Sequence, residues 1–204
     1  MRCPEDRRPG PTSRVQQRRD RVVDTARRLF AGNGFHATGM AQIARESGVA
    51  IGQIYRDFAA KEDIVAAIVE RDCPGIMATE ALHHPAGDGD VASARAWISH
   101  LLNPREKAED IRLFAEIMAE STRNERIGGI FAGVQAEMRK NMLAALAQLA
   151  PEAPPGRRET LADTILTLSL GLLHHRLMRD DLRVEELTEA LEAVVDREIA
   201  AIHA

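Results

Sequence analysis

Apolar residues recur every three or four positions along most of the chain, which is the period of a helix with one buried face. The first such stretch begins near Arg18, and Gly32 and Gly34 follow it as typical stop signals. Its apolar positions are Val22, Val23, Ala26, Leu29 and Phe30. The pattern therefore predicts an amphipathic helix that ends close to these glycines.

Two short helical stretches come next, at 40–47 and 51–58, and the letters SGVA separate them. Gly48 lies in this break and permits a left-handed turn, which the corner of a helix-turn-helix needs. A further helix is predicted over 61–72, because its apolar residues share one face and Pro74 follows it. These helices are typical of a small DNA-binding head.

Helical periodicity continues to the end of the chain. The letters HHPAGDGD at 83–90 predict a loop. Beyond this loop the predicted helices are 90–102, 104–123, 125–149, 157–179 and 184–203. Because no stretch alternates with a period of two, we expect an all-α fold. Its parts would be a helix-turn-helix DNA-binding domain at 16–62, with three helices, and a helical effector-binding and dimerisation domain at 63–204.

The net charge of −4 hides an uneven distribution. Residues 1–62 carry 12 Lys and Arg against 7 Asp and Glu, whereas residues 63–204 carry 15 against 24. A basic N-terminal part indicates contact with a polyanion, and an acidic remainder indicates a different partner. The alternative is a charged arm combined with chance, and residues 1–15, with their prolines and arginines, are predicted to be a flexible basic arm.

Composition narrows the class of protein. The chain has 204 residues, of which 45% are hydrophobic and 28% charged, as in ordinary globular proteins. No window approaches 18 consecutive apolar residues, so we expect no membrane span, and the N-terminus lacks the apolar segment of a secretory signal. Cys3 and Cys73 form no disulfide framework. This cysteine usage predicts a cytoplasmic protein.

The stretch VAIGQIYRDF at 49–58 fits a helix that enters the major groove of DNA. Val49, Ile54 and Phe58 are spaced to anchor it from behind. The positions left facing outward are Ala50, Ile51, Gly52, Gln53 and Arg56. Gln can read adenine and Arg can read guanine, each through two hydrogen bonds.

Tyr55 is the only tyrosine of the chain and falls within this stretch. Its ring can lie on sugar and its hydroxyl can donate to phosphate. Lys61 falls in the first turn of the next helix, where the helix dipole disfavours a cation. A phosphate opposite Lys61 would explain its position. The alternative for Tyr55 is a half-buried aromatic residue that stabilises a small helical head.

The stretch from Phe30 to Ile64 resembles the DNA-binding signature of TetR (tetracycline-repressor) family regulators. The positions that match in register are Gly34, Phe35, Thr38, Ile43, Ala44, Gly48, Val49, Gly52, Ile54, Tyr55, Phe58, Lys61 and Glu62. So many matches over one continuous stretch make the resemblance specific.

The resemblance implies roles for individual residues. Thr38, Tyr55 and Lys61 would contact phosphate. Gln53 and Arg56 would lie in or beside the groove, and Ile51 would approach the bases through apolar contact. Gln42, on the preceding helix, is a further candidate for base contact.

Two positions depart from the TetR pattern. Position 50 is commonly Ser or Thr, which caps the recognition helix and touches phosphate, but Ala50 can do neither. Loss of such a cap typically costs about 1 kcal/mol. Gly39 likewise replaces a common Ser or Thr at the start of the second helix.

For the remainder of the chain, the resemblance implies a homodimer with a pocket for a small ligand. The two terminal helices carry apolar stripes that can pair with a symmetry mate as a four-helix bundle. These stripe residues are Leu161, Ile165, Leu168, Leu172, Leu187, Leu191 and Val194. A dimer would read a palindromic operator with two half-sites. The alternative is that both stripes face the core of their own subunit.

Candidates for the pocket come from the interior helices. They are Trp97, Leu101, Phe114, Ile117, Met118, Phe131, Met138, Met142, His174 and Leu177, and His100 is a further polar group. Core packing is the ordinary alternative for each of them. We expect a small, largely apolar effector that tilts the helix at 61–72 through Ile68 and Val69 and so releases a repressor from DNA.

Three other functions compete with this interpretation. The letters GNGFHATG lack the spacing of a phosphate loop, and the His pairs at 83–84 and 174–175 lack metal-site spacing, so we expect no enzyme, metal or cofactor. A redox sensor would use Cys3 and Cys73, but only Arg71 lies near Cys73 to lower its pKa. The remaining alternative is a DNA-binding regulator without a pocket, which a cavity in the second domain would disfavour.

Overall fold

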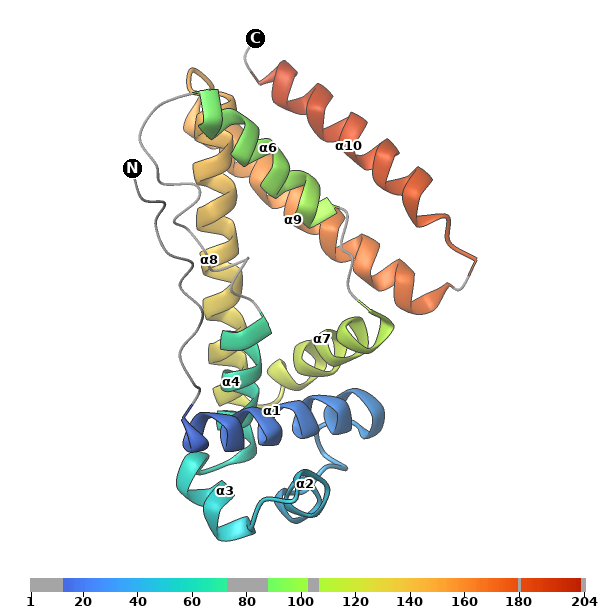
Figure 1. Cartoon of the computed structure of the whole chain (residues 1–204). Helices are drawn as coiled ribbons and strands as arrows, with labels where there is room; N and C mark the ends of the chain where they lie inside the picture. Colours follow the sequence, from blue (N-terminus) through green and yellow to red (C-terminus); the bar gives the residue numbers. More distant parts are fainter. Residues whose placement is uncertain (1–12, 73–87, 103–106, 180, 203–204) are drawn as a thin grey trace, which may run out of the picture.

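Figure 1 shows the chain as a computed structural model, in which the described residues are 13–72, 88–102, 107–179 and 181–202. Within these ranges the chain forms helices and no strand, so the prediction of an all-α fold is confirmed. The helices are α1 (Arg14–Asn33), α2 (Met40–Ser47), α3 (Ile51–Asp57), α4 (Lys61–Asp72), α6 (Asp88–Leu102), α7 (Ala108–Ser121), α8 (Glu125–Leu149), α9 (Pro155–Met178) and α10 (Val184–Ala201). None of them is both long and apolar enough to cross a membrane.

Two helices begin several residues away from the predicted position. α1 starts at Arg14 because Ser13 caps it, with the Ser13 hydroxyl accepting the Gln16 N–H at 3.2 Å. The predicted arm is therefore too long at its C-terminal end, and residues 1–12 lie outside the described part. α7 starts at Ala108 instead of Pro104, and the Asp110 carboxylate accepts the Lys107 N–H at 3.2 Å in its first turn.

The head consists of α1–α4 and forms the lower end of the molecule in Figure 1. Its core contains Phe30, Ile43, Ile54, Phe58 and Ile64, which come from all four helices and the end of α3. Gly48 ends α2 with a φ of 67°, and this left-handed residue turns the chain toward α3 as predicted. Because Ile64 packs in the core of the head, the predicted domain limit at residue 62 divides α4.

The body consists of α6–α10 and has a second core. Its buried residues include Ile98, Met142, Leu146, Ile165 and Ile199, from four different helices. α8 runs along the body from the head to the far end of the molecule (Figure 1). Leu113 of α7 and Ile127 at the start of α8 are buried in the core of the head. These two helices therefore join the head to the body by apolar contact.

Candidate nucleic-acid interface and cavity

The outer face of α3 is formed by the side chains that the sequence predicted to face outward. Tyr55 is 52% exposed and Ile51 is 43% exposed, whereas Ile54 is fully buried in the head. Ala50, Gly52, Gln53 and Arg56 are also exposed. The half-buried position considered for Tyr55 is therefore not the one that the structure shows. This face lies at the end of the molecule away from α10 (Figure 1).

α3 is held against α1 by two arginines. The Arg18 guanidinium donates to both carboxylate oxygens of Asp57, at 2.7 and 2.9 Å. Arg19 donates to the Asp57 carbonyl oxygen at 2.8 Å, and its guanidinium lies 4.4 Å from the centre of the Phe58 ring. The hydrogen bonds from Arg18 lower the pKa of Asp57 below its ordinary value. These contacts fix the end of α3 and thus the direction of its outer face.

The two departures at the starts of α2 and α3 are visible in the structure. Ala50 and Gly39 occupy the N-cap positions, and neither helix has a side-chain cap hydrogen bond. The Ala50 carbonyl still accepts the N–H groups of Gln53 and Ile54, at 2.8 and 3.1 Å. α3 therefore begins with backbone bonds alone, and no side chain caps the N–H groups of its first turn.

Thr38 does not lie on the exposed face. Its side chain is fully buried, and its hydroxyl donates to the Gly34 carbonyl at 2.9 Å, with a longer contact to the Leu29 carbonyl. In this conformation the predicted phosphate contact of the Thr38 hydroxyl is wrong, because the group is enclosed by the turn after α1. Gln42 is half-buried, and its amide donates to the Glu46 carboxylate at 3.3 Å along α2.

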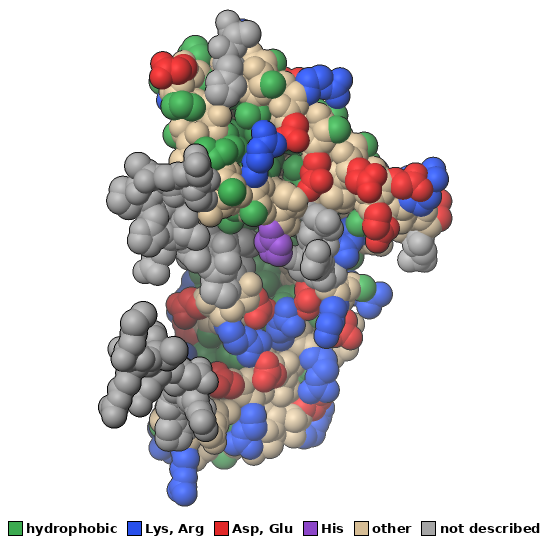
Figure 2. Space-filling model, turned by 45° about the horizontal axis from the view of Figure 1, so that its top comes forward, with side chains coloured by type: hydrophobic (Ala, Val, Ile, Leu, Met, Phe, Trp, Pro, Cys, Tyr) green, Lys and Arg blue, Asp and Glu red, His purple; other side chains and the backbone are tan. Residues whose placement is uncertain are grey.

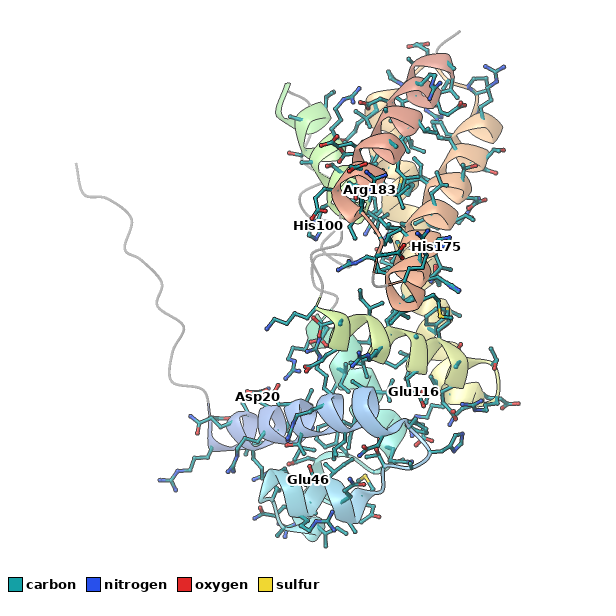
Figure 3. The ribbon with its side chains drawn as sticks, turned by 90° about the vertical axis from the view of Figure 1, so that its right-hand side faces the viewer. Asp20, Glu46, His100, Glu116, His175 and Arg183 are labelled. Atoms are coloured by element: carbon teal, nitrogen blue, oxygen red, sulfur yellow. The ribbon has the colours of Figure 1, made fainter. Side chains whose placement is uncertain are left out.

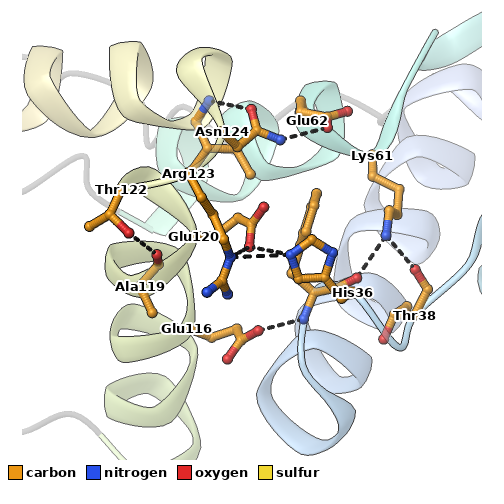
Figure 4. Close-up of polar contacts among 12 residues, drawn as sticks. His36, Thr38, Lys61, Glu62, Glu116, Ala119, Glu120, Thr122, Arg123 and Asn124 are labelled. Atoms are coloured by element: carbon orange, nitrogen blue, oxygen red, sulfur yellow. Dashed lines mark hydrogen bonds and ion pairs between the residues drawn. The ribbon is translucent and has the colours of Figure 1, made fainter.

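Lys61 also turns inward, as Figure 4 shows. Its ammonium group donates to the carbonyl oxygens of Phe35 and Thr38, at 2.7 and 2.8 Å, and lies 4.2 Å from the centre of the Phe35 ring. Burial lowers the pKa of Lys61, while the charges of nearby Glu62 and Glu120 oppose this effect. The carbonyls, and not a phosphate, explain the cation in the first turn of α4.

α7 is tied to the turn after α1 by two acidic residues that the sequence analysis did not single out. Glu116 lies where α7 faces α1 (Figure 3), and its carboxylate accepts the Phe35 N–H at 2.7 Å (Figure 4). Glu120 is buried and pairs with His36 at 2.9 Å and with Arg123 at 2.7 Å. Helical periodicity does not identify such residues, because Phe35 and His36 lie far from them in the sequence.

A cavity of about 360 Å³ lies between the head and the body. In Figure 2 hydrophobic side chains are visible in a hollow at this level, bordered by charges of both signs. Five of the predicted pocket residues line the cavity, and so does His100. The five are Leu101, Phe114, Ile117, Phe131 and Met138. Ile68 and Val69 of α4 form part of its wall.

Five other predicted pocket residues do not line this cavity. Met142 is fully buried in the body core, and Trp97 packs against that core. His174 is exposed on α9. Met118 and Leu177 are half-buried away from the cavity lining. These five residues lie outside the lining of this cavity, because periodicity identifies an inward face without distinguishing core from cavity.

One end of the cavity is charged, which the sequence analysis did not foresee. Arg27 donates to Asp72 at 2.5 Å and to Asp110 at 2.7 Å, and all three residues line the cavity. The polar residues Gln135 and Ser169 line it elsewhere. Asp72 is the last residue of α4, where the helix dipole disfavours an acid. An acid at the C-terminal end of a predicted helix is the sequence feature that indicates a basic partner.

The predicted dimerisation stripe faces largely inward. Leu161, Ile165 and Leu172 are buried within the body of their own subunit. Leu168, Leu187 and Leu191 are half-buried, and Val194 is 37% exposed. Leu161 and Ile165 belong to the body's own core, and Leu161 also lines an open groove between α9 and α10. The dimer contact of these seven residues stays a prediction.

Residues 22–68 match the family model described as "Bacterial regulatory proteins, tetR family", and residues 90–200 match the one described as "BetI-type transcriptional repressor, C-terminal". The chain belongs to the TetR family. TetR-family proteins are DNA-binding transcriptional regulators and not enzymes, so the prediction of a DNA-binding regulator is confirmed.

Similarity to other TetR-family regulators extends over nearly the whole chain. It is 25% identical to the regulator UidR of Escherichia coli K12 over 189 residues, which cover 89% of this chain and 92% of UidR. The structure of Salmonella enterica GusR matches with a TM-score of 0.71 and 24% identity, covering 94% of this chain and 97% of GusR. A regulator from Saccharomonospora viridis, solved in complex with choline, matches with a TM-score of 0.68 and 21% identity, covering 88% and 96%.

Proposed function

We propose that this TetR-family regulator is a homodimeric repressor that binds a palindromic operator and leaves it when a small, largely apolar ligand fills the cavity. The observation that carries the proposal is the position of α4. Ile68 belongs to the core of the head and also lines the cavity. A ligand that displaces Ile68 and Val69 would therefore move the head directly.

The DNA contacts that we propose come from the outer face of α3. Gln53 and Arg56 would read bases, Ile51 would approach the bases through apolar contact, and Tyr55 would contact the backbone. Ala50 and Gly52 let the backbone approach closely, and Gln42 would lie at the edge of the interface. Thr38 and Lys61 would act indirectly by holding the turn before α2. Because chromosomal DNA is the proposed partner, the proposed compartment is the cytoplasm.

The dimer would form through α9 and α10, at the end of the molecule away from α3. An open groove lies between these helices and is lined in part by Thr160, Thr164, Val194 and Ile202. A second copy that covers this groove would remove the exposed Val194 from water. Two heads would then face half-sites about 34–36 Å apart, one turn of DNA.

The cavity supports a ligand-responsive regulator over one without a pocket. Its volume of about 360 Å³ falls in the range of sites for small molecules. Its apolar residues come from α4, α6, α7, α8 and α9, so a ligand would touch most of the body at once. The choline complex of the Saccharomonospora viridis regulator is consistent with a small organic ligand for this fold.

The proposal is tested by measuring how the binding of a small molecule changes the affinity for DNA. Compounds that raise the melting temperature of the full chain are first identified by thermal shift. Fluorescence anisotropy at fixed salt then gives the affinity for DNA from upstream of its own gene, with and without each compound. We expect cavity-binding compounds to weaken DNA binding by about 5- to 150-fold, the usual range of such coupling. An affinity that stays constant with every tight-binding compound contradicts the proposal.

A further inference from the structure

The charged end of the cavity belongs to a row of ion pairs that joins the head to the body. Arg71 donates to Asp24 at 2.6 Å and to Asp72 at 3.3 Å, and Arg27 donates to Asp72 and to Asp110. Among the described residues this row holds three carboxylates and two guanidinium groups. It therefore carries one excess negative charge, and Asp110, at its end, has Arg27 as its guanidinium partner.

The three residues of this row that also line the cavity are partly shielded from water. The side chains of Arg27, Asp72 and Asp110 are 31%, 27% and 23% exposed. Charges at such positions interact more strongly than they do on an open surface. A ligand that enters the cavity thus meets two carboxylates and one guanidinium group at the charged end and largely apolar walls elsewhere.

We propose that the ligand of this cavity is an organic cation with an apolar body, whose positive group pairs with Asp110 and displaces Arg27 from it. The inference rests on the proposed function and names the ligand class for the same site. Phe114 and Phe131 line the cavity with ring centres 5.9 Å apart. Their ring faces suit an apolar body and favour a nearby cation.

An anion is disfavoured by the same geometry. To pair with Arg27 it would have to share the guanidinium with two carboxylates at 2.5 and 2.7 Å, and both of them would lie beside its own charge. A cation breaks one of these bonds and replaces it with an equivalent pair. A neutral apolar ligand fills the cavity without using its charged end.

Displacement of Arg27 would carry the signal to DNA by a direct route. Arg27 lies on α1, whereas Asp110 lies in the first turn of α7. Their ion pair is one link between the head and the body. The other links of α7 to the head are the hydrogen bond of Glu116, the ion pair of Glu120 and the packing of Leu113, all C-terminal to Asp110. Loss of the Arg27 link would therefore free the first turn of α7 from α1 while these contacts hold the rest of the helix.

The first test compares three probes of similar shape on the full chain by isothermal titration calorimetry. They are benzyltrimethylammonium, its neutral carbon isostere neopentylbenzene, and the anion phenylacetate. We expect the cation to bind about tenfold more tightly than the isostere, as one shielded ion pair allows, and the anion more weakly than either. Equal affinity for cation and isostere, or preference for the anion, overturns the inference.

Variants then test the residues. Asp110→Asn keeps the shape of the side chain and an acceptor for the Lys107 N–H, and it should lower the affinity for the cation about tenfold while leaving the isostere unchanged. Asp163→Asn is the matched control, since Asp163 pairs with Arg139 outside the cavity lining. Equal effects of the two substitutions overturn the assignment of Asp110.

Arg27→Gln tests the route to DNA, with Arg139→Gln as its control. We expect Arg27→Gln to bind the cation but to lose most of the change in DNA affinity that the cation causes in the unaltered protein. If the variant responds to the cation like the unaltered protein, Arg27 does not carry the signal. If the unaltered protein binds no operator at all, the proposed function itself fails, and that result is distinct from operator binding that responds only to neutral ligands.

Discussion

Arg18 of α1 and Asp57 at the end of α3 are joined by two parallel hydrogen bonds of 2.7 and 2.9 Å. This planar arrangement fixes both the position and the rotation of the Asp57 side chain. Since Asp57 follows Arg56 directly, the same contact orients the outer face that we propose for DNA. Arg18 therefore acts as a positioning residue.

Replacement of Asp57 by Asn should weaken operator binding severalfold while the helical content stays the same. Asn can accept one of the two hydrogen bonds but carries no charge, so the end of α3 becomes less well fixed. Anisotropy with labelled operator measures the change. Asp20→Asn, which alters a carboxylate of α1 that accepts a hydrogen bond from nearby Gln16, is the control. Similar losses in both variants would show that general charge, and not positioning, is responsible.

The pH dependence of stability should report on the same contact. Hydrogen bonds from Arg18 lower the pKa of Asp57 below its ordinary value of 3.8, and the charges of Arg18, Arg19 and Arg56 act in the same direction, against the effect of burial. The stability that this contact contributes is thus present above the pKa of Asp57 in the unfolded chain. It is lost as pH falls through the lower pKa of Asp57 in the native protein. Urea unfolding of Asp57→Asn should lose less stability upon acidification than the unaltered protein. An unchanged pH profile would contradict this account.

If α3 reads bases, substitutions of Gln53 and of Arg56 should have different effects. Gln53→Ala should reduce operator affinity by about 1–3 kcal/mol and relax the preference at one base pair per half-site. If Arg56 reads a base, Arg56→Ala should also change the sequence preference; if it contacts phosphate, it should instead reduce the salt dependence of binding. Competition with single-base operator variants separates the two. If neither variant loses affinity or sequence preference, α3 does not form part of the DNA interface.

The head could be predicted from sequence because its signals are local. α2 and α4 have the predicted bounds, since short apolar repeats and Gly48 define them without reference to distant residues. The burial of Ile54 and the exposure of Tyr55 follow from their places on one helix. The family resemblance then assigned this helix its role.

The remainder depends on contacts between residues distant in sequence. Thr38 and Lys61 have the residue types of phosphate ligands, yet nearby carbonyl groups hold them inside the head. An apolar stripe such as that of Leu161 predicts burial but not whether its partner is the same subunit or a second copy. Likewise nothing in the sequence places Arg27 beside Asp110, because only the packing of α1 on α7 brings them together.

The link between Glu116 and the head predicts a loss of stability on truncation. Glu116→Ala removes the acceptor of the Phe35 N–H and should lower the free energy of unfolding by about 1–3 kcal/mol, because a backbone donor loses a charged partner. Urea denaturation measures the change. Glu109→Ala, which truncates an exposed side chain of the same helix, is the control and should stay within about 0.5 kcal/mol. A loss no larger than that of the control would show that Phe35 is held by other contacts.

The proposed dimer predicts a strong effect at an exposed position. Val194→Arg would place a charge in the interface between α9 and α10 of two copies, and it should shift the protein toward monomer and weaken operator binding. Light scattering after size-exclusion chromatography measures the mass. Val91→Arg is the matched control, because Val91 is 46% exposed on α6. A Val194 variant that remains a dimer would move the interface to another surface.

The central claim is that the outer face of α3 is presented twice to duplex DNA. Selection of duplexes from a random library by the full chain tests this claim most directly, with Tyr55→Ala and Gln53→Ala variants selected in parallel. The account predicts that the unaltered protein enriches an inverted repeat with half-sites about one turn apart and that the variants enrich it weakly or with altered bases. No enriched repeat, or the same repeat enriched equally by all three proteins, would contradict it.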